Sequence, residues 1–385
     1  MPMILETVPK GELPTRAPNQ PPEVVGSQTK RATRPTTSLP QAMIDGAKVP
    51  KRERFNPAKH LAYQRPERIV SMKDIGLEGA GISATAISEP FPLFTQEAIA
   101  QMRAEIFSKD SLENCQYSSS FCKNMIRAMG PAIAPFIYDA WNSPEVLNGI
   151  SEIAGIELVP VFDIDIGNVN ISFDDQTGTT ARDETALDEV PAFAWHYDSF
   201  PFVCVTMLSD CKGMIGGETA IRTQSGEVMK LRGPSMGTAI VLQGRYIEHQ
   251  ALKAFGGSER ITMVTSFRAK SPFVKDESVL TGVRGISNVS DLYTQYTRYR
   301  LEILEDRIRA KRKSENYRAA SKRPFDVDEI RVWLETQRQF IDAMLVEIHE
   351  VEDGEEDTCV YKFRFRISDW RFHCKRKRGY MRAPG

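Results

Sequence analysis

The sequence lacks the features that would place it in several common classes of protein. Its six cysteines include no Cys-x-x-Cys pair, so neither a cysteine-ligated zinc site nor a dense disulfide framework is indicated. No apolar run is long enough to cross a membrane, and the first residues lack the basic start and apolar stretch of a secretory signal. We therefore expect no membrane contact and a cytoplasmic protein.

An excess of basic charge is also missing. The 50 Lys and Arg residues are balanced by 51 Asp and Glu residues, which gives a formal net charge of -1. A domain that binds nucleic acid through its phosphates normally presents a strongly basic surface. The composition therefore argues against a nucleic-acid partner and favours a small-molecule substrate.

The N-terminal third divides into two segments. Residues 1–55 are rich in proline and polar residues, which predicts an extended or disordered arm because such a stretch buries too little apolar area to offset its ordering entropy. Residues 56–155 predict a group of helices that buttress a sheet. Thr95 is the expected N-cap of one helix, and Ser143 followed by Pro144 is the expected start of another.

The middle of the chain, residues 156–286, changes to short β-rich runs separated by Gly, Pro and Asp. This spacing is typical of a barrel or sandwich. The runs that we expect to be strands are Glu157–Ile171, Phe202–Leu208, Met236–Leu242 and Ile261–Phe267.

Residues 287–385 predict a helical hairpin followed by a strand, as part of the same domain. The hairpin offers a surface for a homodimer, and its turn is expected at Ser321–Phe325, which contains Pro324. The strand is expected over Tyr361–Ile367 because apolar and basic residues alternate there. The expected apolar faces of the two helices are Leu292, Tyr296, Tyr299 and Ile303, then Ile330, Trp333, Leu334, Ile341, Met344, Leu345 and Ile348.

A metal site is indicated by three residues. In an extended backbone the first and third residues of His196-Tyr197-Asp198 lie on the same side, where both can reach one ion. His249 supplies a third ligand. Two imidazoles and one carboxylate leave the opposite face of the ion open, which is the arrangement that non-haem iron(II) uses to bind a chelating cosubstrate and dioxygen.

An anion clamp follows the third ligand. Arg260 and Thr262 lie on one face of a predicted strand, 11 and 13 residues after His249. A guanidinium can pair bidentately with the distal carboxylate of 2-oxoglutarate, and the hydroxyl adds a hydrogen bond. The two motifs together therefore predict one site for iron(II), 2-oxoglutarate and dioxygen, with ascorbate as the reductant in assays.

The block from Trp195 to Lys270 resembles fungal members of the iron(II)/2-oxoglutarate-dependent oxygenases with a double-stranded β-helix core. The segments that carry this resemblance are Trp195-His196-Tyr197-Asp198-Ser199-Phe200-Pro201-Phe202-Val203, Gly216-Gly217-Glu218-Thr219, Leu242-Gln243-Gly244-Arg245-Tyr246 and Arg260-Ile261-Thr262. The set that it resembles includes an aziridine-forming valine oxygenase.

The resemblance implies an α+β fold: a double-stranded β-helix, or jelly roll, buttressed by N-terminal helices and followed by a C-terminal helical hairpin. It implies iron ligands at His196, Asp198 and His249, and cosubstrate binding at Arg260 and Thr262. It also implies a small substrate in a specialised pathway, such as valine or a similar aliphatic amino acid that is closed to an aziridine.

Five further residues are candidates for contact with the substrate. Asn168 and Asn170 alternate with Val169 and Ile171, so one of these sets faces the interior, although a strand-end hydrogen bond explains the asparagines equally well. Arg245 would meet a substrate carboxylate, or pair structurally with an acid, which is commoner. Phe363 and Phe365 would line the mouth of the pocket, or belong to the core, as an apolar strand face usually does.

Two other functions remain open. A hydroxylase or desaturase of a peptide, alkaloid or terpenoid intermediate would need a broader and more apolar pocket. A non-catalytic β-helix domain would bind a ligand or protein and would have no need of an intact triad.

Overall fold

The structure is a computed structural model that describes residues 5–6, 21–24, 34–36, 38–119, 122–173, 195–212, 214–231, 235–252, 254–255 and 259–350. All of them belong to one compact unit, Met1–Gly354. Glu355–Gly385 lies outside the described residues, and so do the strand expected over 361–367 and the candidates Phe363 and Phe365.

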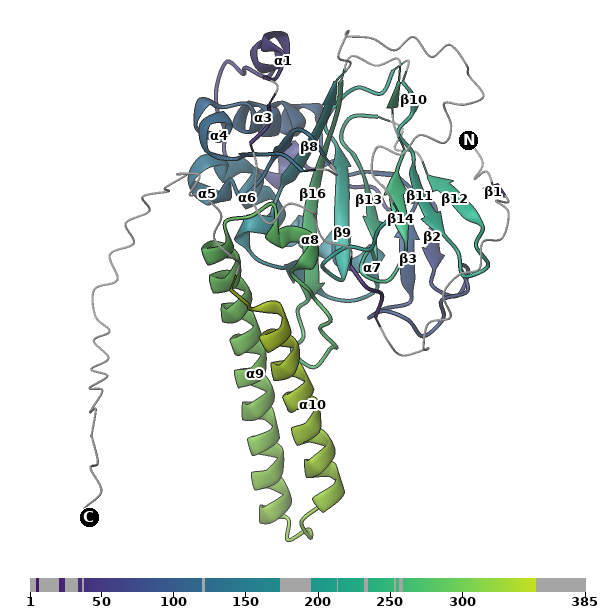
Figure 1. Ribbon diagram of the computed structural model, residues 1–385, viewed down its shortest axis with the longest axis vertical. Coiled ribbons are helices and arrows are strands. Elements are labelled where there is room, and N and C mark those ends of the chain that lie inside the picture. Colours follow the sequence, from purple (N-terminus) through teal and green to yellow (C-terminus); the bar gives the residue numbers. More distant parts are fainter. Residues whose placement is uncertain are drawn as a thin grey trace, which may run out of the picture. The chain divides into compact units, whose positions relative to one another are not determined.

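Two antiparallel sheets form the centre of this unit (Figure 1). The larger sheet has the order β2 (Ile69–Ser71), β3 (Thr85–Ser88), β13 (Thr238–Leu242), β9 (Phe202–Met207), β16 (Glu259–Ala269), β8 (Asn168–Phe173), β6 (Met125–Ile126) and β5 (Gln116–Tyr117). Two short strands, β4 (Phe91–Pro92) and β7 (Leu158–Pro160), pair with β13 and β16. The smaller sheet has the order β1 (Leu5–Glu6), β12 (Val228–Leu231), β11 (Thr219–Arg222) and β14 (His249–Ala251), and β10 (Ile215–Gly216) pairs with β15 (Ala254–Phe255).

The chain passes back and forth between the two sheets. After β8 in the larger sheet it pairs through His196 with β14 of the smaller one, returns as β9, crosses to β11 and β12, and returns as β13. It then crosses to β14 and ends the core as β16, between β8 and β9. This order is that of a jelly roll, so the predicted double-stranded β-helix is confirmed.

Strand β16 divides its side chains between two faces, as a strand with a period of two must. Met263 and Phe267 face the helices, where the indole of Trp141 donates to the Met263 sulfur at 3.3 Å and meets the Phe267 ring edge-on at 5.9 Å between centroids. Arg260 and Thr262 lie on the opposite face, which lines a cavity. The helix packing therefore fixes which residues of β16 reach the cavity.

Helices α3 (Gln96–Ile106), α4 (Lys109–Asn114), α5 (Gly130–Ile133) and α6 (Pro135–Asn142) gather beside β8 and β16 (Figure 1). The predicted helix starts are confirmed: Thr95 caps α3, and Ser143 caps α7 (Pro144–Ala154), with Pro144 in its first turn. These helices lie where a buttress was expected, but residues 56–155 are not helical throughout, because they also contribute the short strands β2 to β6 to the larger sheet.

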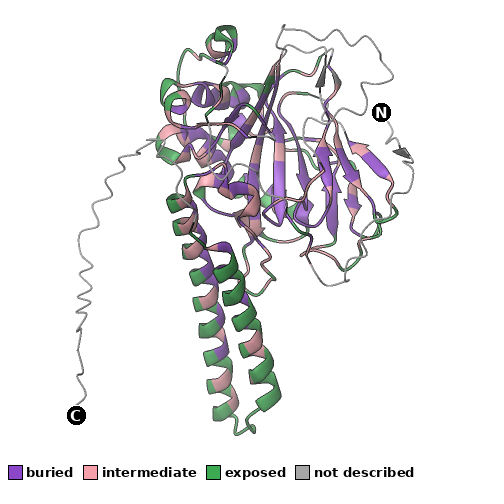
Figure 2. Cartoon of the chain, viewed as in Figure 1, coloured by how far each residue is buried: buried purple, intermediate pink, exposed green. Residues whose placement is uncertain are grey.

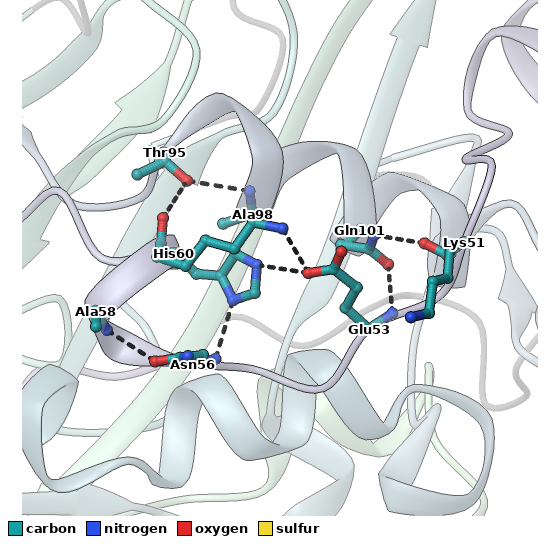
Figure 3. A network of polar contacts seen from close by, with 9 residues as sticks. Lys51, Glu53, Asn56, Ala58, His60, Thr95, Ala98 and Gln101 are labelled. Carbon is teal, nitrogen blue, oxygen red and sulfur yellow. Dashed lines mark hydrogen bonds and ion pairs between the residues drawn. The ribbon is translucent and has the colours of Figure 1, made fainter.

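A polar network attaches the segment before these helices to α3 (Figure 3). His60, in α2 (Pro57–His60), is buried and accepts a hydrogen bond from the amide of Asn56 on Nδ1 at 2.9 Å. The Gln101 side chain donates to the carbonyl of Lys51 at 2.8 Å and accepts from the amide of Glu53 at 3.2 Å. His60 therefore helps to pack this segment, and it does not belong to the predicted metal site.

The N-terminal arm differs in part from the extended segment that was expected over residues 1–55. Gln41–Gly46 forms helix α1, and its Met43 is buried, as is Leu39 just before it. Farther upstream, Val24 is also buried. These apolar residues explain why parts of the arm adopt a defined structure, because each covers core surface that would otherwise face water.

The strand expected over Glu157–Ile171 is interrupted. β7 ends at Pro160, a 3-10 turn occupies Asp163–Asp165, and β8 begins only at Asn168. Gly167, with φ of 67°, supplies the left-handed residue that redirects the chain into β8. The other three expected strands are confirmed as β9, β13 and β16, with ends shifted by up to two residues.

The helical hairpin is confirmed as α9 (Val289–Ala320) and α10 (Val327–Glu347), and the four predicted apolar residues of α9 are buried. The predicted face of α10 is wrong in part: Met344 is buried as expected, but Leu334, Ile341 and Leu345 are exposed, and Figure 2 shows how much of this helix is open to solvent. Its buried stripe is Gln337, Phe340, Met344 and Glu347. Among the described residues, no helix is long and apolar enough to cross a membrane.

The physical reason for the shifted stripe is polar pairing. Glu347 is buried because it accepts a hydrogen bond from Arg284 at 3.0 Å and another from the amide of Leu280 at 2.7 Å. Phe340 is buried beneath the guanidinium of Arg300, whose carbon lies 3.6 Å from the ring centroid. Apolar periodicity alone could not show these partners.

Glu105 makes the stability of the fold depend on pH. Its carboxylate accepts from the amides of Phe136 and Ile137 at the start of α6, yet burial outweighs these bonds and raises its pKa from 4.5 to about 6. The folded state therefore holds the proton more tightly than the unfolded state does. The resulting stability is fully present below pH 4.5 and is lost as the pH rises through 6.

We expect Glu105→Gln to remove this dependence. Relative to the wild type, the free energy of unfolding of the variant should rise by about 1–2 kcal/mol between pH 4.5 and pH 7, measured by urea unfolding at each pH. Glu113→Gln on the exposed surface of α4 is the control and should show no such rise. Parallel pH profiles of the wild type and Glu105→Gln would contradict the prediction.

Candidate metal centre

His196 and His249 are held together by their backbones. The amide of His196 donates to the carbonyl of His249 at 2.9 Å, and the amide of His249 donates back at 3.0 Å. Such a hydrogen-bonded antiparallel pair places both side chains on the same face. Their rings lie 4.3 Å apart between centroids.

Asp198 completes the group because it follows His196 by two residues and its amide donates to the carbonyl of Gly244 at 2.9 Å. Its carboxylate oxygens lie 3.7 Å from His196 Nε2 and 3.5 Å from His249 Nε2. One ligand atom from each residue lies within 4.8 Å of the other two. Because metal–nitrogen and metal–oxygen bonds are about 2.0–2.2 Å long, these separations suit three ligands of one ion.

A buried polar atom without a partner supports this interpretation. Asp198 Oδ2 takes no hydrogen bond among the described residues, although it is shielded from water. A buried carboxylate oxygen in that state is costly unless a cation pairs with it. The donor set of two imidazoles and one carboxylate fits a non-haem iron(II) ion.

The protonation of the ligands also fits a metal. Burial alone would raise the pKa of Asp198, but the charges of His249, His196 and Arg245 outweigh it and hold that pKa below its ordinary value. The ring of His249 lies 2.9 Å from the carbonyl of Ile247 through Nδ1, so a proton on Nδ1 leaves the Nε2 lone pair for the ion. Burial lowers the pKa of His249, yet the Asp198 carboxylate raises it more, and a bound cation would take the place of that proton.

Arg260 and Thr262 reach the same cavity from β16. Arg260 is buried, its Nε has no partner among the described residues, and Nη2 makes only a long hydrogen bond of 3.4 Å to the carbonyl of Gly217. Burial lowers the pKa of this guanidinium because no carboxylate among the described residues pairs with it. A buried cation of this kind would be stabilised by an anion in the cavity.

The remaining predicted residues fall into two groups. Asn168 and Asn170 line the cavity, whereas Val169 and Ile171 lie on the other face of β8 and are buried. Arg245 does not line it: its guanidinium donates to the carbonyl of Glu277 at 2.9 Å and to that of Pro22 at 2.5 Å. Arg245 therefore joins two loops through these hydrogen bonds.

Two further cavity residues carry charge and were not predicted. Arg127 follows β6, and Asp165 ends the 3-10 turn before β8. Their side chains form a buried ion pair at 2.8 Å, and both line the cavity. No local pattern could have found them, because Asp165 lies 31 residues before His196 and neither Arg127 nor Asp165 is in a β-strand.

Comparisons with known proteins add only distant similarities. No family model matches the chain, and no curated protein does. A 2OG-Fe(II) oxygenase family oxidoreductase from Burkholderia pseudomallei is 15% identical over 37% of this chain and 66% of its own, with a TM-score of 0.28. A prolyl-4-hydroxylase from Pseudomonas putida is 16% identical over 46% and 88%, with a TM-score of 0.27.

A third similar structure is SnoN, a non-heme alpha ketoglutarate dependent epimerase from nogalamycin biosynthesis. It is 13% identical over 46% of this chain and 74% of its own, with a TM-score of 0.34. At such scores these likenesses carry no functional argument. The assignment of the site therefore depends on the geometry of this chain's own residues.

Gly244 leaves room for the Asp198 carboxylate. A Cβ atom at this position would overlap Asp198 Oδ2. We therefore expect Gly244→Ala to push the carboxylate aside and to weaken iron(II) binding by about 10- to 100-fold, measured by anaerobic calorimetry.

Gly46→Ala is the matched control, because its new Cβ would have no heavy atom within 4 Å. Circular dichroism checks that both variants fold. An unchanged iron affinity in a folded Gly244→Ala protein would show that Asp198 is not held as a ligand at this position.

Proposed function

We propose that this protein is an iron(II)- and 2-oxoglutarate-dependent oxygenase. The observation that carries the proposal is the shared cavity, in which Oδ2 of Asp198 and Nε of Arg260 are buried without a hydrogen-bond partner among the described residues. An iron ion satisfies the first, and the distal carboxylate of 2-oxoglutarate satisfies the second. Asn170 and Thr262 lie opposite one another on β8 and β16 and line the same cavity, where they would contact that cosubstrate.

The residues present fit both groups. His196, Asp198 and His249 would hold iron on one face, and Arg260 with Thr262 would orient 2-oxoglutarate. When bound, iron and 2-oxoglutarate supply the oxidising power to activate one C–H bond of a substrate, with release of succinate and carbon dioxide. The protein's own task is to position that bond and to exclude water. Arg260 and His249 are buried, which keeps water away from this part of the cavity.

The finer proposal is that the substrate is a small aliphatic amino acid, such as valine, which is closed to an aziridine. In that reaction one C–H and one N–H bond break and a C–N bond forms, so the amino acid loses two hydrogens. Dioxygen accepts the electrons, with one oxygen atom entering succinate and the other leaving as water. The support for this proposal is the resemblance over Trp195–Lys270 together with the cavity volume.

The cavity volume is about 220 Å³. Sites for drug-sized ligands have volumes of roughly 300–1,000 Å³. Because 2-oxoglutarate would occupy part of the space, little room remains for a terpenoid, an alkaloid or a folded peptide segment. A small substrate is therefore favoured over these alternatives.

The test is turnover with iron(II), ascorbate, 2-oxoglutarate and valine. We expect valine-dependent succinate and a product two mass units lighter than valine, both detected by mass spectrometry. His196→Ala should abolish both and lose iron, whereas a non-catalytic binding domain would keep its function in this variant.

Each negative result has its own meaning. If the wild type forms no succinate with any amino acid although it binds iron and 2-oxoglutarate, the amino-acid proposal fails. If it binds neither iron nor 2-oxoglutarate, the oxygenase proposal fails as well.

We also propose that the hairpin forms a homodimer through α10. Leu334 and Leu345 are 54% and 69% exposed, which is unusual for leucines on one helix. Light scattering should give the mass of two chains for the wild type and the mass of one chain for Leu334→Glu. A monomeric wild type at micromolar concentration would exclude the dimer.

A further inference from the structure

The Arg127–Asp165 ion pair presents unused hydrogen-bonding groups to the cavity. Asp165 Oδ1 accepts both from Arg127 Nη2 at 2.8 Å and from Asn168 Nδ2 at 2.6 Å. Asp165 Oδ2 has no hydrogen-bond partner among the described residues, and neither Nε nor Nη1 of Arg127 has one. Both residues are at least nine-tenths buried and line the cavity, so a ligand there is well placed to complete their bonding.

The sheet register separates this pair from the 2-oxoglutarate clamp. Met125 of β6 lies opposite Asn170, which lies opposite Thr262, so the next inward position on β6 brings Arg127 level with Asn168 and Val264. Arg260 and Val264 are four residues apart on β16, which is roughly 13 Å along the strand. A cosubstrate clamped by Arg260 and Thr262 therefore leaves Arg127 for another ligand.

The candidate metal ligand His249 lies in the opposing sheet, away from the Arg260 end. Arg260 reaches Gly217, just before β11, where Thr219 pairs with Ala251 of β14. His249 precedes Ala251 by two residues and is therefore displaced away from the Arg260 end. Arg127 and Asp165 thus face a part of the cavity that iron and 2-oxoglutarate, held by the residues named above, would leave open.

Charge balance limits what can bind there. Iron(II) and Arg260 together neutralise Asp198 and the two carboxylates of 2-oxoglutarate, and Arg127 neutralises Asp165. A ligand with a net charge would leave one charge buried and unpaired, which is strongly unfavourable. A zwitterion adds no net charge, and its two ends match the two unused groups.

We propose that Arg127 and Asp165 together bind the substrate as an α-amino acid, Arg127 holding its carboxylate and Asp165 its ammonium group. Asn168 positions Asp165 for this contact. The inference rests on the oxygenase function proposed above and assigns the substrate class to residues of this chain. It also makes these two residues determinants of specificity, because a ligand that lacks either charge leaves its partner unpaired.

The test is calorimetry on protein loaded with manganese(II) and 2-oxoglutarate, without oxygen. Binding of manganese and 2-oxoglutarate is measured first, and its absence would overturn the proposed function itself. The 20 protein amino acids are then screened by thermal shift, and the best binder is titrated beside its analogues without the carboxylate and without the amine. For valine these analogues are isobutylamine and isovalerate.

We expect at least one amino acid to bind and both analogues to bind on the order of 100-fold more weakly. No binding by any amino acid would overturn the inference, and so would equal binding of either analogue. In both cases 2-oxoglutarate binding would leave the proposed function intact.

The variants test the residues themselves. Arg127→Met should weaken amino-acid binding on the order of 100-fold and leave 2-oxoglutarate affinity unchanged. Because this change leaves Asp165 buried without its partner, the double variant Arg127→Met/Asp165→Asn, which removes both charges, provides a second measurement. Unchanged amino-acid affinity in the double variant would overturn the inference.

Arg103→Met is the matched control. Arg103 forms an ion pair of 2.6 Å with Glu259 and is only 12% exposed, but it is not among the residues that line the cavity. It should leave amino-acid affinity unchanged. If it weakened binding as much as Arg127→Met, the effect would be one of general stability.

Discussion

Two main-chain hydrogen bonds join His196 to His249, and the rest of the site depends on them. They bring strands from distant parts of the chain together and put both imidazoles on one face. Asp198 joins them because it is two residues beyond His196, and Gly244 leaves space for its carboxylate. The candidate metal centre therefore depends first on backbone pairing, which then fixes where the three side chains lie.

The register of β16 is the second constraint. Trp141 packs against Met263 and Phe267, which leaves Arg260 and Thr262 on the cavity side. A slip of one residue would turn the cationic clamp into the helix layer and bring apolar side chains to the metal. The N-terminal helices thus contribute to the site without supplying any ligand to it.

Local patterns predicted the parts of the fold that local physics controls. Thr95 and Ser143 cap helices because their hydroxyls accept the unpaired amides of the first turn. The face of α10 was not predictable, because Glu347 is buried by Arg284 and Leu280, which lie more than 60 residues away. A hydrophobic stripe shows that a helix has a buried side, but distant polar partners decide which side it is.

The sequence by itself determined the order His-x-Asp, His, Arg-x-Thr, because residues two apart on an extended chain share a face. Only the tertiary structure decided that Arg127, Asp165 and Asn168 meet in the same cavity, and that Arg245 turns away to hold Pro22 and Glu277. The physical reason is that alternation along a strand is a local property. Pairing between buried charges depends on which strands lie side by side, and this depends on packing of the whole domain.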